Sequence, residues 1–151
     1  MTNTFSHLRA TRKNVLKIIQ QHDLETLNLI PEGFNNNIIW NVGHVIATQQ
    51  LLTYGLSDLP TIIHQDYIDK YRKGTKPSGS INNTEFESLK ELLLSAIDKT
   101  EEDFSTGKFE AFKVYETSFG VTLNNIEEAI HFNNIHEAMH LGNMLSMKKL
   151  V

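Results

Sequence analysis

One stretch of the chain, residues 38–54, is apolar around most of a helical circumference, and this constrains the fold more than any other feature. Its apolar side chains fall on nearly every side of a helical wheel; they are Ile38, Ile39, Trp40, Val42, Val45, Ile46, Ala47, Leu51 and Leu52. A helix that is hydrophobic all round is normally buried. The asparagines at 35–37 can cap its start, and Gly55 follows its end. We therefore expect a helix that other helices surround.

Three further segments repeat apolar residues at helical spacing. The first covers residues 4–21. The second begins at a capping box, in which Thr84 and Glu87 stand three residues apart. The third begins at another capping box, formed by Asn125 and Glu128, and has lysines in its final turn, where cations suit the helix dipole. Together with the apolar segment, these patterns predict four long helices.

The connections between these helices differ in length. Residues 56–83 contain two prolines and two glycines and have room for one short helix, around residues 63–71. Residues 109–123 are aromatic and β-branched but isolated, so we expect an ordered loop packed on the helices rather than a sheet. The sequence predicts an all-α fold, a four-helix bundle with a long crossover connection.

Length and composition exclude several classes of protein. A chain of 151 residues is the size of one domain, expected to span residues 1–151. A net charge of −4 argues against nucleic acid or an anionic membrane as a partner. No stretch approaches 18 uninterrupted apolar residues, and the N-terminus lacks the apolar core of a signal peptide, so we expect a cytoplasmic protein. The absence of cysteine excludes disulfides, thiolate metal sites and cysteine nucleophiles.

One small basic cluster lies in the expected crossover. It consists of Lys70, Arg72, Lys73 and Lys76, around Gly74 and Pro77. We interpret these side chains as solvated, with contact to a phosphate or another anion as the alternative.

The segment HEAMH places His136 and His140 four residues apart in the last helix. Such residues lie roughly 40° apart on the wheel, one turn above the other, so both can face one metal ion. They share the apolar side of the helix, which means that they replace core residues. Asn133 and Asn143 flank the pair and are candidates to orient a ligand or substrate, although ordinary interhelical hydrogen bonding is favoured. Glu137 stands about 100° from His136 on the wheel, so we expect it at the surface or in contact with a metal ligand rather than with the metal itself.

Two imidazoles rarely hold a divalent ion alone, and His44 is the best third candidate. It shares a narrow polar band of the apolar helix with Asn37, Asn41 and Thr48. This band faces either solvent or a polar pocket in the bundle. Gly43 favours the pocket, because a glycine inside a helix often marks close approach of another element. Trp40 is a candidate to line that pocket, with a core position as the alternative.

Two motifs carry a resemblance to a known family: WNVGH at 40–44 and HEAMHLGNM at 136–144. With these motifs, its length and its four-helix pattern, the whole chain resembles the DinB-like (DinB/YfiT) superfamily, and PEGFNNNIIWNVGH, KYRKGTKP and HFNNIHEAMHLG look most like a bacterial branch. The resemblance implies that His44 faces inward and binds a divalent metal with His136 and His140. Many members carry Arg-Gly-Gln after the last histidine, where this chain has Leu141, Gly142 and Asn143.

Three neutral imidazoles leave a coordination position open, as in catalytic metal sites, and zinc, nickel or iron accepts such ligands. The resemblance implies an S-transferase or isomerase whose metal activates a low-molecular-weight thiol, while many other members are assumed to be hydrolases. We hypothesise a metal-dependent enzyme that activates a thiol or water and acts on a small-molecule substrate. The alternative is a non-catalytic structural or interaction protein, in which the metal or the histidine cluster only holds the helices together. In both cases we expect a homodimer. DNA binding has no support, because the chain lacks a basic recognition helix.

Overall fold

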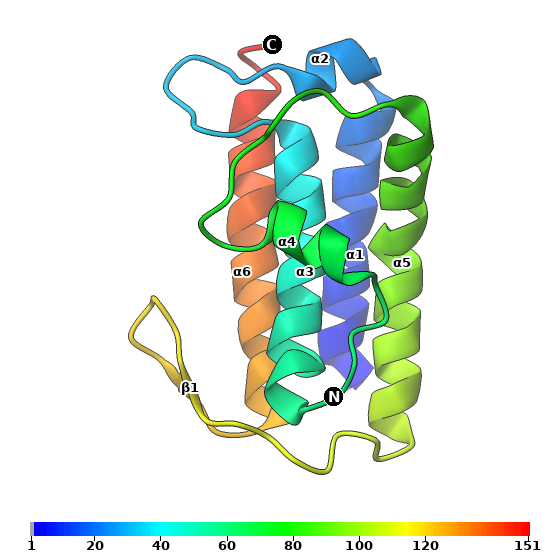
Figure 1. Cartoon of the computed structure of the whole chain (residues 1–151), viewed down its shortest axis with the longest axis vertical. Helices are drawn as coiled ribbons and strands as arrows, with labels where there is room; N and C mark the ends of the chain where they lie inside the picture. Colours follow the sequence, from blue (N-terminus) through cyan, green and yellow to red (C-terminus); the bar gives the residue numbers. More distant parts are fainter. Residues whose placement is uncertain (1) are drawn as a thin grey trace.

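The computed structural model describes residues 2–151, which form a bundle of long helices lying side by side (Figure 1). The four long helices are α1 (Thr2–Gln20), α3 (Ile38–Thr53), α5 (Asn83–Ser105) and α6 (Ile126–Met147). The predicted all-α four-helix bundle is confirmed. Within residues 2–151, no helix is both long enough and apolar enough to span a membrane.

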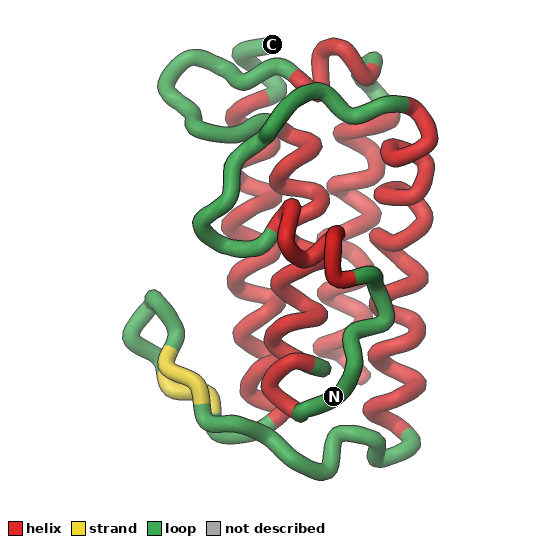
Figure 2. The backbone as a smooth tube through the Cα atoms, in the orientation of Figure 1, coloured by secondary structure: helices red, strands yellow, loops and turns green. Residues whose placement is uncertain are grey.

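The shorter elements belong to the connections, which Figure 2 separates from the bundle by colour. They are α2 (Leu24–Asn28), the 3-10 helix η1 (Gly55–Ser57), α4 (Gln65–Tyr71), β1 (Tyr115–Glu116) and β2 (Thr122–Leu123). The long crossover between α3 and α5 passes over one face of the bundle and carries α4, as predicted (Figure 1). Residues 109–123 are mostly loop, as predicted, but β1 and β2 pair antiparallel, so the prediction that this segment contains no sheet is wrong for these two short strands.

The apolar helix α3 lies among the other elements, which explains its composition. It contacts α4, α5 and α6, while α1 packs against α5 and α6. Fourteen of its sixteen residues are buried, and the polar ones among them are Asn41, His44, Gln49, Gln50 and Thr53. Since buried polar groups need hydrogen-bond partners, the interior of this bundle must hold polar networks as well as an apolar core.

Three of the long helices, α3, α5 and α6, start directly after an asparagine. Asn125 caps α6 as predicted, because its side chain accepts a hydrogen bond of 2.9 Å from the backbone of Glu128. The predicted start of α5 at Thr84 is wrong by two residues. Asn82 is the cap, and its side chain accepts a hydrogen bond of 3.0 Å from the backbone of Glu85. Asparagine is the stronger cap of the two, which accounts for the earlier start.

Candidate metal centre

The structure brings the three predicted histidines together between α3 and α6. One ring nitrogen of His44, one of His136 and one of His140 all lie within 4.8 Å of one another. The ring centroids of His136 and His140, one helical turn apart, are separated by 4.5 Å, and that of His44 lies 5.2 Å and 4.7 Å from them. All three side chains are largely buried. Residues from two helices far apart in the sequence therefore form one nitrogen-lined cluster.

The orientation of His44 is set by the crossover helix α4. Its Nδ1 donates a hydrogen bond of 2.8 Å to the backbone oxygen of Tyr71. A carbonyl can only accept, so Nδ1 carries the proton and Nε2 keeps its lone pair. Gly43 permits this contact, because a Cβ atom at that position would lie 2.4 Å from the Tyr71 ring. The close approach predicted from Gly43 is confirmed, and His44 faces the interior.

The orientation of His140 is set by Asn41 of α3. The side-chain oxygen of Asn41 lies 2.7 Å from Nδ1 of His140. The amide nitrogen of Asn41 donates to the backbone oxygen of Asn37 and to the side chain of Asn36, which identifies the other atom as the oxygen. Nδ1 of His140 is therefore the donor, and its Nε2 is free to bind a ligand. The sequence placed Asn41 on the polar band but did not identify this role.

The third imidazole, His136, has an unused polar atom. Its Nδ1 is buried and has no hydrogen-bond partner among residues 2–151. A buried polar atom without a partner is costly and calls for an explanation. Coordination of an ion by this Nδ1 would supply one.

Burial holds the three histidines in their neutral form. It lowers the pKa of His136 to about 3, with a further contribution from His140 and His44 nearby. It also lowers the pKa of His140 to about 4, again with a contribution from His44. The pKa of His44 is lowered because burial outweighs the hydrogen bond to Tyr71, which acts in the opposite direction. Neutral imidazole is the form that binds metals, so the cluster is ready for an ion at neutral pH.

These features fit a divalent metal with nitrogen ligands. In metal sites, a ligating histidine usually donates its other ring N–H to a carbonyl or carboxylate, which fixes its tautomer. His44 and His140 both do this. Among the described residues, the cluster of possible metal ligands consists of the three histidines and contains no carboxylate. Zinc, nickel and iron all accept such ligands.

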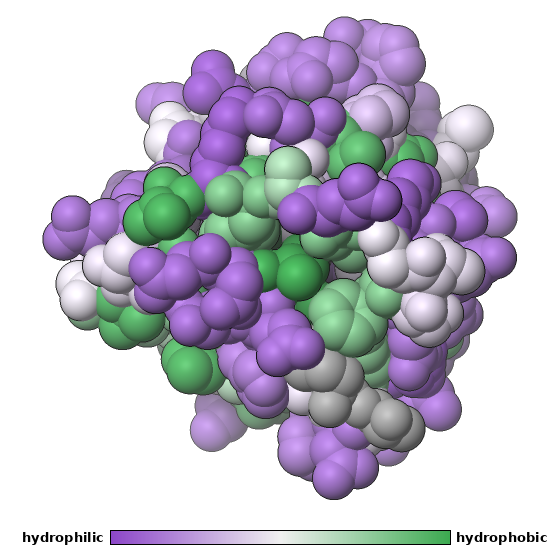
Figure 3. Space-filling model, turned by 90° about the horizontal axis from the view of Figure 1, so that it is seen from below, coloured by the Kyte–Doolittle hydropathy of each residue, from purple (hydrophilic) through white to green (hydrophobic). Residues whose placement is uncertain are grey.

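A cavity of about 380 Å³ adjoins the cluster, with His44 and His136 in its wall. This volume is typical of pockets for small molecules. Besides the two histidines and Gly55, the cavity is lined by Thr48, Leu51, Leu52, Leu56, Lys73, Tyr115, Thr117, Ser118, Phe119 and Phe132. The wall thus combines α3, η1, the start of the loop after α4, the segment that includes β1, and α6. Seen from the end of the bundle shown in Figure 3, hydrophobic surface gathers within a hydrophilic surround.

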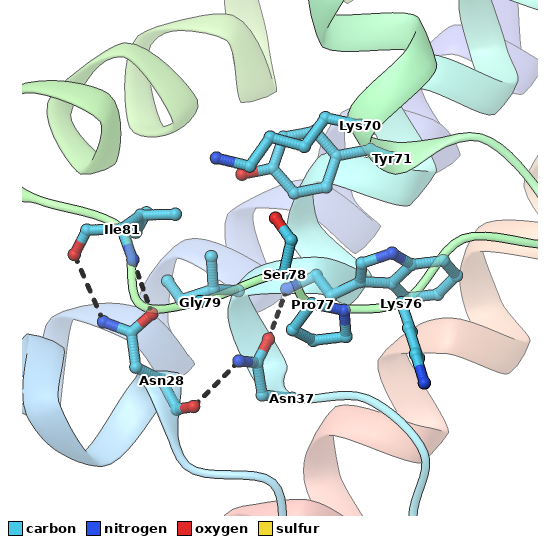
Figure 4. Close-up of a pocket in the computed structure, with 11 residues that line it drawn as sticks. Asn28, Asn37, Lys70, Tyr71, Lys76, Pro77, Ser78, Gly79 and Ile81 are labelled. Carbon is cyan, nitrogen blue, oxygen red and sulfur yellow. Dashed lines mark hydrogen bonds between the residues drawn. The ribbon is translucent and has the colours of Figure 1, made fainter.

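Trp40 lies beside the cluster but lines a different crevice. Its ring stacks on His44, with centroids 4.5 Å apart and planes 11° apart, and its Nε1 donates to the hydroxyl of Thr75. The crevice that it lines is much smaller than the cavity. Hydrogen bonds from Asn37 to Asn28 and between Asn28 and Ile81 join residues of its lining (Figure 4). Trp40 is a buried residue that supports His44.

The two asparagines predicted to flank the pair lie in different surroundings. Asn133 is buried and donates a hydrogen bond of 2.9 Å to Glu137, not to a histidine. Asn143 is partly exposed and forms no side-chain hydrogen bond with the described residues. Their expected role in orienting a ligand remains a prediction.

Glu137 lies in the core, so a surface position for it is wrong. Its carboxylate accepts hydrogen bonds of 2.9 Å and 2.7 Å from Arg12 of α1, and both side chains are almost fully buried. Arg12 also donates to the backbone of Leu93 and to the side chain of Gln49. Arg12 was not predicted as a core residue, although its place on the apolar stripe of α1 was a signal: it stands four residues after Leu8 and three before Val15.

Fold and site together define a class of protein: a four-helix bundle with a three-histidine cluster shared between two helices. A sequence profile of the DinB superfamily matches residues 7–144, and the chain belongs to this superfamily. The chain is also similar in fold to the crystal structure of the conserved protein of locus from Enterococcus faecalis. That match has a TM-score of 0.61 and 14% identity and covers 99% of this chain and 95% of the other. The comparison with curated proteins found no match.

Proposed function

We propose that the protein is a metal-dependent enzyme in which His44, His136 and His140 hold a divalent ion, zinc, nickel or iron, beside the cavity. The observation that carries this proposal is the pairing of a buried, neutral three-histidine cluster with a cavity whose wall contains two of its members. When bound, such an ion lowers the pKa of water or of a thiol and polarises a bound group. Catalytic metal sites keep one coordination position open, and a cavity beside the ion would give a substrate access to that position.

The chain's own residues would position the reactants. Tyr71 and Asn41 hold two of the imidazoles in one tautomer, and Trp40 covers the face of His44. The lining of the cavity has no aspartate or glutamate, so a carboxylate general base is not part of the proposal. A low-molecular-weight thiol or water is the nucleophile that this arrangement suits, which gives an S-transferase or a hydrolase acting on a small molecule.

The first experiment is elemental analysis of the purified chain without a histidine tag or added nickel. We expect about one ion per chain, lost in His44→Ala and in His140→Ala. The matched control is His131→Ala, since His131 lies on α6 but is exposed. If the unmodified chain carries no metal and takes up none of zinc, nickel, iron or manganese, the metal site does not exist.

A second measurement separates an enzyme from a metal-stapled bundle. With cobalt in the site, addition of a small thiol should change the visible spectrum, because an open position lets the thiol sulfur coordinate. A spectrum that stays unchanged, together with loss of thermal stability on chelation, would favour the metal-stapled bundle.

In either case we propose a homodimer, supported by apolar side chains on the outer face of α6: Ile135, Met139 and Leu145 are all at least 40% exposed.

A further inference from the structure

The cavity beside the histidines is mainly apolar, but Lys73 adds an ammonium group to its wall. Most of its other lining side chains are leucines, aromatic rings and hydroxyl groups, and none of them is acidic. A ligand that fills the cavity would therefore bury apolar surface against its leucines and phenylalanines, which drives binding. It would also meet a positive charge that no carboxylate in the lining offsets.

Lys73 differs in this respect from its basic neighbours. Lys70 forms an ion pair of 2.6 Å with Glu85, and Arg72 lies 3.5 Å from Asp69. Lys76 lines the small crevice next to Trp40. Lys73 lines the cavity and forms no ion pair within residues 2–151. Of the four side chains in the basic cluster, it is the one with both an unpaired charge and access to the cavity.

The position of Lys73 is tied to the histidine cluster. It follows Tyr71 by two residues, and the backbone oxygen of Tyr71 holds the ring of His44. The Tyr71 hydroxyl donates a hydrogen bond of 2.6 Å to Glu85 of α5, and the Tyr71 ring packs on Gly43, so the end of α4 is fixed against two long helices. The loop that carries Lys73 therefore starts from an anchored residue.

We propose that the cavity binds a small organic anion with an apolar body, whose carboxylate or similar group contacts Lys73. This inference rests on the proposed function and deepens it, because it names the class of substrate. The apolar body lies against Leu51, Leu56, Phe119 and Phe132, and the anionic group points to the rim where Lys73 stands. The hydrophobic contacts supply affinity, and the ammonium group selects anions over neutral and cationic molecules of the same shape.

The test compares three probes of nearly equal shape: phenylbutyrate, phenylbutanol and phenylbutylamine. Each is titrated into the protein at pH 7.5, and Kd is measured from backbone amide shifts in NMR spectra. Since Lys73 is exposed, we expect the acid to bind more tightly than the alcohol by about two- to fivefold, and the amine to bind most weakly. Lys73→Gln should remove the preference for the acid, and Lys73→Glu should reverse it in favour of the amine.

Two controls make the test specific. Lys76→Gln removes a neighbouring exposed charge and should leave the preference for the acid unchanged. Leu51→Trp, at a partly exposed residue of the lining, should weaken all three probes, because it fills the cavity.

The titrations are run on metal-loaded and on chelated protein, which separates this inference from the proposed metal site. The Lys73-dependent preference is expected in both forms. If the preference for the acid persists in Lys73→Gln but disappears on chelation, the metal attracts the anion and the inference is overturned. Equal binding of the three probes, or no binding of any, also overturns it, while the metal content of the protein would still stand as a separate result.

Discussion

The side-chain oxygen of Asn41 lies 2.7 Å from Nδ1 of His140, so α3 fixes the ring that α6 contributes to the cluster. Because outer-shell partners of this kind orient a ligating histidine, we predict that Asn41→Ala lowers zinc affinity by about 10- to 100-fold. Competition with a chromophoric chelator measures the change. Asn41→Asp keeps an acceptor and should retain most of the affinity, and Asn36→Ala should have little effect. Wild-type affinity in Asn41→Ala would show that this hydrogen bond does not matter.

The buried pair of Arg12 and Glu137 links α1 to α6 one residue from His136. Removal of one partner leaves an uncompensated charge in the core, so we predict that Arg12→Met or Glu137→Leu each lowers the free energy of unfolding by about 3–5 kcal/mol. The double variant should recover a large part of this loss, since neither charge remains. Denaturant unfolding of the unmodified protein, the two single variants and the double variant measures the coupling free energy between the two residues. Additive losses in the double variant would contradict the prediction.

Gly43→Ala tests the contact between α3 and α4. Without the contact, alanine would stabilise the helix by about 1 kcal/mol. With the Tyr71 ring only 2.4 Å from the new Cβ atom, we predict the opposite sign, a loss of about 1–3 kcal/mol in the free energy of unfolding. Gly142→Ala is the matched control: it also lies in a helix, and nothing stands within 4 Å of its added Cβ atom, so it should stabilise. Stabilisation by both substitutions would show that the Tyr71 ring moves freely.

Acid stability should depend on Asp103 at the end of α5. Burial alone would raise the pKa of this carboxyl group, but hydrogen bonds from Lys108, Tyr54 and Lys99 outweigh burial and lower the pKa to about 2. The pKa in the folded state is therefore below that in the unfolded state. The resulting stabilisation is complete above about pH 4 and is lost as the pH falls toward 2.

We predict that Asp103→Asn lowers the free energy of unfolding at pH 7 by about 1–2 kcal/mol and flattens its decrease between pH 4 and 2. Urea unfolding across this range measures both effects. The variant Asp98→Asn, at an exposed position of the same helix, serves as the comparison. An unchanged pH dependence in Asp103→Asn would assign the acid sensitivity to other groups.

The proposed homodimer predicts a change in mass for a variant of the outer face of α6. Ile135 is 59% exposed and Met139 41%, one turn apart. Light scattering after size exclusion should give two chains per particle for the unmodified protein and one for Ile135→Glu combined with Met139→Glu. Val114→Glu, at a loop residue of similar exposure, should leave the dimer intact. A monomeric unmodified protein at micromolar concentration would end this proposal.

Much of the fold was predictable because it depends on local patterns. The apolar circumference of residues 38–54 identified the surrounded helix, and Asn125 identified the start of α6. The three histidines were predicted as a group from their spacing, from the wheel and from the family resemblance. What brings His44 inward became clear only from the structure, since its partner is a backbone oxygen 27 residues away in the crossover.

The features that were not predicted had only weak local signals. Arg12 stands on the apolar stripe of α1, but its buried partner Glu137 lies 125 residues further on, so the ion pair itself could not be predicted from a local pattern. Thr84 and Asn82 are both acceptable caps by residue type, and the structure selects Asn82. The paired strands β1 and β2 contribute only two residues each, too few to give an alternating pattern.

The histidine cluster joins two parts of the chain that are far apart in the sequence. His44 comes from the second long helix and His136 from the fourth, yet their rings lie 5.2 Å apart. A cation bound by both residues would close a loop that spans more than half of the chain, and it would bind the native state in preference to the unfolded ensemble. Such an ion would therefore slow proteolysis of the protein, because it would lower the population of unfolded chains.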